Sequence, residues 1–334
     1  MNPDEEKPRQ GIAKRRLMAS ASSLYVTPKG VSVASLAKAE EIQDWAGRRK
    51  TAPVRKWFVR SLDGEAPMLS ILYSGEGKGG RSGYVTIKVL LCLLWKTSKP
   101  PFTTIMTAPA LAELLDLPDP RGKGARRVRD ALQTLDTANL VRLTPRPGNS
   151  PLIQLMNETG NGEEYSLPST AFVRSQLANS TQPTMDPSLY FQLPEELWTE
   201  GFFQALKGPG LVMLLILLAE EGHKKPVWFS GAEFNDRYRI SPSTRTKGTQ
   251  ELVELDMLDV DSVRLPADWG SSTFERQRRR YQYQLTGVIS RLAEAEIEPR
   301  AAISAKPETS TKPIPPQPSV KDQTKKRKRR QPTK

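Results

Sequence analysis

The stretch that decides the fold runs from Gly208 to Leu265 and reads GPGLVMLLILLAEEGHKKPVWFSGAEFNDRYRISPSTRTKGTQELVELDMLDVDSVRL. Its first part predicts an apolar helix over Leu211–Glu221, and a short β-type run follows at Val227–Ser230. The next residues, Gly231–Tyr238, predict a short second helix. The stretch therefore begins with a helix, a strand and another helix.

A third helix is signalled by its first two residues. Ser241 is a good N-cap, and Pro242 suits the first helical position, where its missing N–H costs nothing. We expect this helix to end near Asp256 and two strands to follow, Leu258–Leu265 and Arg279–Thr286, joined by a polar loop. Helix, strand, helix, helix, strand, strand is the order of a winged-helix domain, which we assign to residues 188–298.

A fainter copy of the same order occupies residues 54–156. Leu132 and Leu135 in its third helix match Leu252 and Leu255, at a constant separation of 120 residues. The sequence therefore predicts an α+β fold with two winged-helix domains in tandem. The elements expected in this block are a strand-like run Met68–Tyr73, helices Tyr84–Lys96, Pro109–Leu115 and Gly124–Ala138, an extended run Phe102–Met106, and strands Val141–Leu143 and Leu152–Met156.

The segments outside the two blocks are more polar. Residues 1–53 predict a mostly disordered N-terminal arm with one amphipathic helix, Val33–Trp45. Residues 157–187, rich in Gly, Asn, Ser and Thr, predict a linker in which Tyr165–Phe172 can pack locally. Residues 299–334 predict a disordered basic tail, because a segment with so few large apolar residues cannot offset the entropy of ordering.

The charge of the chain favours a polyanionic partner, nucleic acid before an anionic membrane surface. Fifty Lys and Arg against 37 Asp and Glu give +13. Residues 321–334 contain eight basic residues and one acid, so they contribute +7 and leave +6 for the rest. The longest apolar run, Leu211–Ala219, is far shorter than the ~20 residues of a membrane helix. We expect a cytoplasmic, nucleoid-associated protein with no membrane partner.

The expected DNA-reading face of the second block lies opposite Gly248, Leu252 and Leu255, which should pack inward. Lys and Arg can read guanine edges, Gln can read adenine, and hydroxyls can hold phosphates. Four arginines near the wing suit phosphate or minor-groove contact. The alternatives are an ordinary solvated helix face and an edge strand protected by charge. The predicted DNA-binding residues here are Ser243, Thr244, Arg245, Thr246, Lys247, Gln250, Arg276, Arg278, Arg279 and Arg280.

The first block predicts a comparable but weaker site. Gly124, Val128, Leu132 and Leu135 form the inward face of its third helix. One of the two domains could instead serve dimerisation, so a homodimer is a second expectation for this block. The predicted DNA-binding residues are Lys123, Arg126, Arg127 and Arg146, with Arg142 beside the last of them.

Several apparent motifs do not carry chemistry. Gly75–Gly80 satisfies G-x-G-x-x-G, but no acid follows about 20 residues later, as a dinucleotide site requires. Asp256, Asp259 and Asp261 are explained by a helix end and a solvated strand. One cysteine, Cys92, and one histidine, His223, exclude an internal disulfide, a zinc finger and a two-His metal site. We expect no catalytic residue, metal or cofactor, and no enzyme activity.

The second block contains a distinctive set of short motifs. They are Phe191, Leu193-Pro194, Leu197-Trp198, Gly201-Phe202, Leu206, Gly208-Pro209, Val227-Trp228-Phe229-Ser230, Arg237-Tyr238, Ile240-Ser241 and Thr244-Arg245-Thr246. With these motifs the second block resembles winged-helix proteins of actinobacterial plasmids and integrated elements. Together with the fainter first copy, the chain is similar to the tandem winged-helix replication initiators of plasmids.

The resemblance implies sequence-specific binding to double-stranded DNA at repeated origin sites. It also implies opening of the adjacent duplex and recruitment of host replication proteins such as a helicase, without an active site in this chain. A winged-helix transcription regulator, acting as a repressor of a mobile element, is the alternative. A DNA-processing enzyme such as a nuclease or relaxase is disfavoured, because the sequence shows no metal or nucleophile constellation.

Overall fold

The computed structural model describes residues 27–46, 50–61, 64–74, 83–97, 99–177, 186–264 and 279–289. Every described residue belongs to one compact unit, Met1–Ile297. The described part combines helices with three small sheets, so the predicted α+β class is confirmed. The predicted tail lies outside the described residues.

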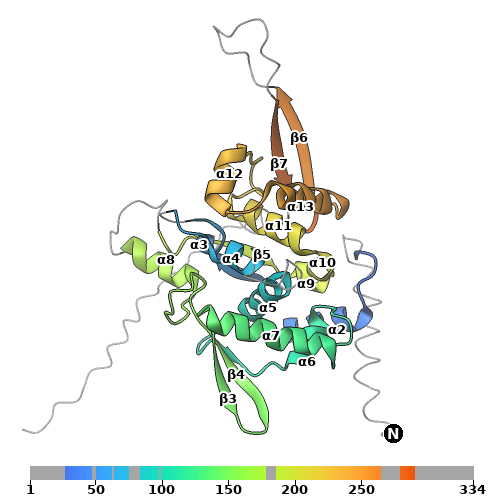
Figure 1. Ribbon diagram of the computed structural model, residues 1–334, viewed down its shortest axis with the longest axis vertical. Coiled ribbons are helices and arrows are strands. Elements are labelled where there is room, and N and C mark those ends of the chain that lie inside the picture. The colour runs from blue at the N-terminus through green and yellow to red at the C-terminus, as the bar shows by residue number, and fades with distance from the viewer. Residues whose placement is uncertain are drawn as a thin grey trace, which may run out of the picture. The chain divides into compact units, whose positions relative to one another are not determined.

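The first series of elements begins after helix α2, Val33–Ala46 (Figure 1). It consists of β1 (Thr51–Arg55), α3 (Lys56–Val59), α4 (Met68–Ser74), α5 (Gly83–Lys96), β2 (Thr103–Thr104), α6 (Ala108–Leu114), α7 (Lys123–Thr137), β3 (Val141–Arg146) and β4 (Asn149–Leu155).

The second series follows helix α8, Pro168–Leu177. It consists of β5 (Tyr190–Pro194), α9 (Glu196–Thr199), α10 (Phe202–Ala205), α11 (Gly208–Ala219), α12 (Gly231–Tyr238), α13 (Pro242–Glu254), β6 (Leu258–Arg264) and β7 (Arg279–Leu285), and it ends in a 3₁₀ helix, η2 (Gly287–Ile289).

The two series share their strand order as well as their element order. In the first, the sheet order is β2–β4–β3. In the second, Val227 forms an antiparallel bridge with Tyr283 of β7, and β7 pairs with β6. In both, the short extended segment after the long apolar helix lies beside the last strand of the series. The same arrangement therefore occurs twice in one compact unit.

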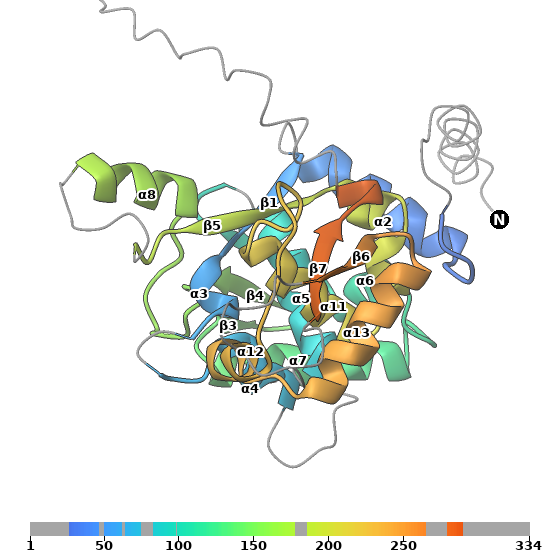
Figure 2. The same cartoon turned by 90° about the horizontal axis from the view of Figure 1, so that it is seen from above.

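Equivalent strands join the two series. β1 and β5 pair antiparallel, from Thr51 opposite Pro194 to Arg55 opposite Tyr190 (Figure 2). Pairing of equivalent strands in opposite directions is what a local two-fold axis produces. Trp95 of α5 stacks on Trp198 of α9, with ring centroids 4.7 Å apart, so the hydrophobic core is continuous across both series.

Helix α13 is fixed against α11 through two residues. A Cβ at Gly248 would lie 2.3 Å from the Pro209 carbonyl oxygen, so only glycine permits this approach. The Glu251 carboxylate accepts hydrogen bonds from the backbone N–H groups of Lys207 and Gly210, at the start of α11. A carboxylate at a helix N-terminus is favourable because the first N–H groups have no partner within the helix.

One expected strand is a helix. Met68–Tyr73 was predicted as a strand-like run, but the chain forms α4 over Met68–Ser74. Leu69 and Leu72 are buried there, three residues apart and on one helical face, and α4 packs against α5. An apolar run this short fits either element by periodicity alone, and the contact with α5 decides it.

Two segments predicted to lie outside the cores contribute to the packing. In the predicted N-terminal arm, the expected helix is confirmed as α2, whose Ala39 and Ile42 belong to the hydrophobic core. In the predicted linker, Tyr165 is buried, in agreement with local packing, and Glu158 has no exposed side-chain surface. Residues 1–26 and 47–49 of the arm and 178–185 of the linker lie outside the described residues.

Candidate nucleic-acid interface

The expected recognition helix of the second series begins as the sequence indicates. The Ser241 hydroxyl accepts a hydrogen bond from the Thr244 N–H at 3.2 Å, and Pro242 occupies the first helical position of α13. Gly248 and Leu252 are buried, as expected. This capping fixes the first turns of α13, which would enter a DNA groove first. The expected residues exposed on α13 are Ser243, Thr246, Lys247 and Gln250.

Two of the residues expected to contact DNA on α13 face the protein instead. Thr244 is buried, and its hydroxyl is 3.0 Å from the Ser241 hydroxyl. The Arg245 guanidinium lies 4.8–5.5 Å from the ring centroids of Phe229, Phe234 and Tyr283, and it donates to the Tyr283 hydroxyl at 3.0 Å. The stacking of Arg245 on aromatic rings ties α13 to β7. Arg245 thus holds the helix in place.

Of the four arginines expected at the wing, two lie within the described residues. Arg276 and Arg278 lie outside the described residues. Arg279 is exposed at the start of β7, opposite Arg264. The Arg280 guanidinium stacks on the Trp228 indole, 3.6 Å from its centroid, on the other face of the hairpin. Trp228 is 43 % exposed, so the pair forms a cationic, flat surface that remains accessible.

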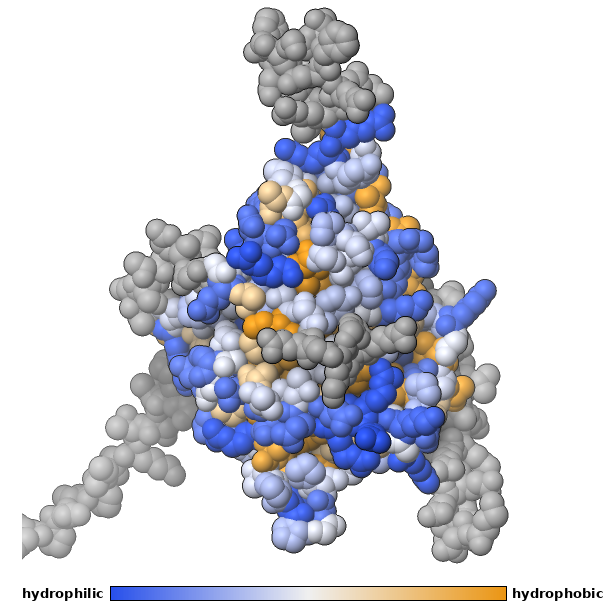
Figure 3. Space-filling model, viewed as in Figure 1, coloured by the Kyte–Doolittle hydropathy of each residue, from blue (hydrophilic) through white to orange (hydrophobic). Residues whose placement is uncertain are grey.

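Helix α7 carries the stronger positive charge. Its first N–H groups are capped by Asp119, whose carboxylate accepts from the Gly122 and Lys123 N–H groups at 3.1 and 2.9 Å. The expected inward residues of α7 are all buried. The surface over α7 is predominantly hydrophilic in Figure 3. The exposed cations on α7, in the loop before it and on β3 are Arg121, Lys123, Arg126, Arg129, Arg142 and Arg146.

Arg127 and Arg129 differ from the expectations for α7. Arg127 donates to the Tyr84 hydroxyl at 3.4 Å and lies 5.8 Å from that ring, so it is partly engaged with α5. Arg129 was not among the expected DNA-binding residues, yet it is exposed. Its position one turn after Arg126 is the signal that could have found it, since residues three apart share a helix face.

The two third helices therefore differ in chemistry. The exposed face of α13 is almost neutral, and its Gln250 amide donates to Glu254 at 2.9 Å. The face of α7 is cationic, with Asp130 as the acid within it. Phosphates are bound by charge, whereas bases are read by directional hydrogen bonds. The α7 face suits backbone contact, and the α13 face suits base contact.

Two further features of the sequence are the glycine-rich run Gly75–Gly80 and the single cysteine, Cys92. Gly75–Gly80 lies outside the described residues. Burial raises the pKa of the Cys92 thiol to about 12, which keeps it protonated and a poor nucleophile. Within the described ranges, no cluster of three His, Cys, Asp or Glu side chains could hold a metal ion, and no helix is long and apolar enough to cross a membrane. No protein-family model, curated protein or solved structure matches this chain.

Proposed function

We propose that this chain binds double-stranded DNA sequence-specifically through two winged-helix domains, and that it acts as a plasmid replication initiator at repeated origin sites. The observation that carries the proposal is the repeated order of elements. In each series, a capped third helix with an exposed polar face is followed by a two-stranded hairpin. A helix of this kind enters the major groove with its N-terminal residues towards the bases.

In this proposal the two domains make different contacts with DNA. Arg126 and Arg129 of α7 grip phosphates, while Lys247 and Gln250 of α13 read base edges. Trp228 and Arg280 give the second hairpin a face that can lie along the sugar–phosphate backbone. The basic residues 321–334 add affinity without preference for sequence.

The salt dependence of binding tests the role of α7. We expect the variant Lys123→Ala/Arg126→Ala/Arg129→Ala to bind every duplex more weakly. The slope of log K against log salt should become shallower by about 2.7, since each lost phosphate contact removes about 0.9. The measurement is a fluorescence-anisotropy titration of a labelled duplex at four or more salt concentrations.

A variant with the same change in charge serves as the control. Lys29, Lys99 and Arg174 are also exposed but lie outside α7, α13 and the hairpins. Their triple replacement by Ala should leave the slope within about 0.5 of the wild type if α7 makes localised contacts. Equal slopes in the two triple variants would show that only the total charge matters, and the α7 interface would be rejected.

A replicon assay tests the initiator part of the proposal. A plasmid that carries this gene and its upstream DNA, with no other origin, should be maintained in a permissive host. Lys247→Ala/Gln250→Ala should abolish maintenance, because the initiator would no longer find its repeats. If the chain binds its upstream DNA in vitro but cannot maintain the plasmid, it is a transcription repressor.

A further inference from the structure

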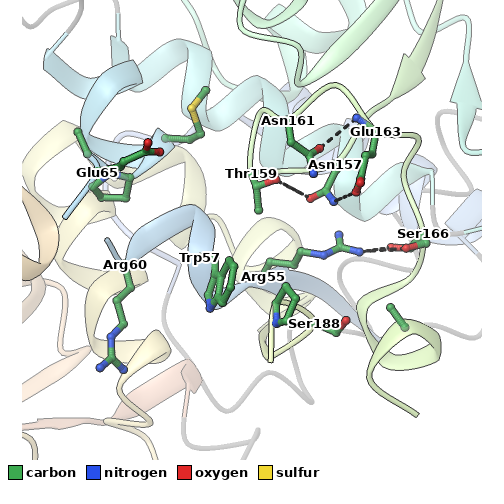
Figure 4. Close-up of a pocket in the computed structure, with 15 residues that line it drawn as sticks. Arg55, Trp57, Arg60, Glu65, Asn157, Thr159, Asn161, Glu163, Ser166 and Ser188 are labelled. Atoms are coloured by element: carbon green, nitrogen blue, oxygen red, sulfur yellow. Dashed lines mark hydrogen bonds between the residues drawn. The ribbon is translucent and has the colours of Figure 1, made fainter. Parts of the chain in front are cut away.

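A cavity of about 680 Å³ lies apart from α7, α13 and the hairpins. Its walls come from segments far apart in sequence: the end of β1 and α3, residues 65–68, the loop 157–163, and Ser166 with α8 and residues 187–188 (Figure 4). The volume is within the range of sites that bind small molecules in proteins.

The cavity is preformed because its floor is anchored by a buried ion pair. Arg55 is 3 % exposed and pairs with Glu158, which is fully buried. The Arg55 Nη2 also donates to the Ser166 carbonyl oxygen at 2.7 Å, and its guanidinium lies over the Tyr165 ring. Glu158 sits between two lining residues, so this pair fixes the loop 157–163.

A close approach holds the same loop against α4. Gly160 has φ +76°, and a Cβ there would lie 3.0 Å from the Met68 Cε. The backbone conformation therefore favours glycine, and the Met68 side chain packs closely against it. Met68 and Thr159 line the cavity from either side of this contact.

The polar wall of the cavity offers both donors and acceptors. The Asn157 Oδ1 accepts from the Thr159 N–H and the Asn161 Oδ1 accepts from the Glu163 N–H, at 3.2 and 3.0 Å (Figure 4). Hydrogen bonds within the loop 157–163 thus orient both side-chain amides. The Asn161 Nδ2 can then donate to a ligand, and the Glu163 carboxylate can accept.

The other walls are flat and carry both cations and carboxylates. Trp57 is half-buried and lies between Glu65 and the loop 157–163 in Figure 4. Pro67 and Pro187 add flat apolar surface. Arg55 is paired with the buried Glu158, and the Arg60 guanidinium lies 3.8 Å from the Glu220 carboxylate. The Glu65 and Glu163 carboxylates also line the cavity, so the lining does not favour an anionic group. These features favour an uncharged planar ring with hydrogen-bonding groups along its edge.

We propose that this cavity binds a nucleobase, stacked on Trp57 with its edge against Asn161 and Glu163. Bases combine a flat apolar face with donors and acceptors on one edge, and asparagine amides pair with adenine in this way. The base can come from a free nucleoside or from single-stranded nucleic acid. The proposal does not depend on duplex binding by α7 and α13.

Calorimetric titrations of the full chain test the proposal and distinguish the two sources. The probes are adenosine, guanosine, cytidine and thymidine, the oligonucleotides d(A)₆ and d(T)₆, and an abasic hexamer. At least one nucleoside or base-containing oligomer should bind saturably, with a Kd below about 1 mM. Binding of the nucleosides identifies a free ligand, and binding of the oligomers alone identifies a single strand. Saturable binding by none of them, or equal binding by the abasic hexamer, would overturn the proposal.

Variants then locate the bound base. Trp57→Ala and Asn161→Ala should each weaken binding about tenfold or more, while Trp57→Phe should retain it because stacking is kept. Ile105→Ala is the control, since Ile105 is an exposed apolar residue outside the cavity lining, and it should leave nucleoside binding unchanged. Thermal melting checks that each variant folds. If a folded Trp57→Ala variant binds as tightly as the wild type, the proposed site is wrong. Duplex binding should be the same in Trp57→Ala and the wild type, so a failure of this proposal is separable from a failure of the proposed function.

Discussion

Arg55→Met is expected to lower the free energy of unfolding at pH 7 by about 3–5 kcal/mol. The substitution leaves the Glu158 carboxylate buried without its cation, and removing one partner of a buried ion pair costs about this much. Methionine keeps the length of the side chain, so the loss reflects charge and hydrogen bonding more than a cavity. Urea denaturation, followed by circular dichroism, measures the effect.

The pH dependence of this variant has a definite sign. Burial is the main cause that raises the pKa of Glu158 above its usual value, and Arg55 opposes the rise. Without Arg55 the pKa rises further, so the folded variant binds a proton that the unfolded chain releases. The destabilisation should therefore shrink as the pH falls from 7 to 5. The double variant Arg55→Met/Glu158→Leu should recover most of the loss. If the double variant is as unstable as Arg55→Met, the two residues are not coupled.

Lys88→Met is expected to raise the free energy of unfolding by about 3 kcal/mol at pH 7. Lys88 lies on α5, and its side chain is 2 % exposed in the protein interior. Its ammonium donates to the Gln204 carbonyl oxygen at 3.1 Å and lies over the Phe203 ring. Burial lowers the pKa of Lys88 from 10.5 to about 8. Each unit by which the pKa is lowered corresponds to about 1.4 kcal/mol of cost for burying the charged ammonium. Methionine avoids this cost because it carries no charge.

The effect of Lys88 on the free energy of unfolding should change with pH between about 8 and 10.5. Because the folded pKa is lowered, the destabilising contribution of Lys88 is absent above pH 10.5 and grows as the pH decreases towards 8. The Lys88→Met variant should lose this dependence. Lys123→Met, at an exposed position on α7, is the control and should change the stability by less than about 0.5 kcal/mol. Parallel curves for the wild type and Lys88→Met between pH 8 and 10.5 would contradict the prediction.

The sequence predicted the elements whose signals are local. Ser241 and Pro242 marked the start of α13, and α12 was predicted with the bounds Gly231–Tyr238 that it has in the structure. The inward position expected for Gly248 is confirmed by its close approach to Pro209. Caps, prolines and helical periodicity act within a few residues, so one sequence is enough to read them.

Features that depend on distant residues were not predicted. The pairing of β1 with β5 joins residues about 140 positions apart, and the sequence of neither strand identifies the strand with which it pairs. Helical periodicity places Arg245 at the edge between the buried and exposed faces of α13. Only the positions of Phe229, Phe234 and Tyr283 show that its side chain turns inward. Glu158, in a polar Gly- and Asn-rich segment, is buried because Arg55 comes from another part of the chain.

Selection from a pool of random DNA duplexes tests sequence-specific binding most directly. The full chain and the variant Lys247→Ala/Gln250→Ala are each used to enrich bound duplexes at physiological salt, with Lys29→Ala as the control. We expect the wild type and the control to enrich one motif. The double variant should lose preference at one or two positions of that motif, by a factor of about 5–150 for each lost base contact. Absence of any enriched motif, or the same motif from the double variant, would contradict the account.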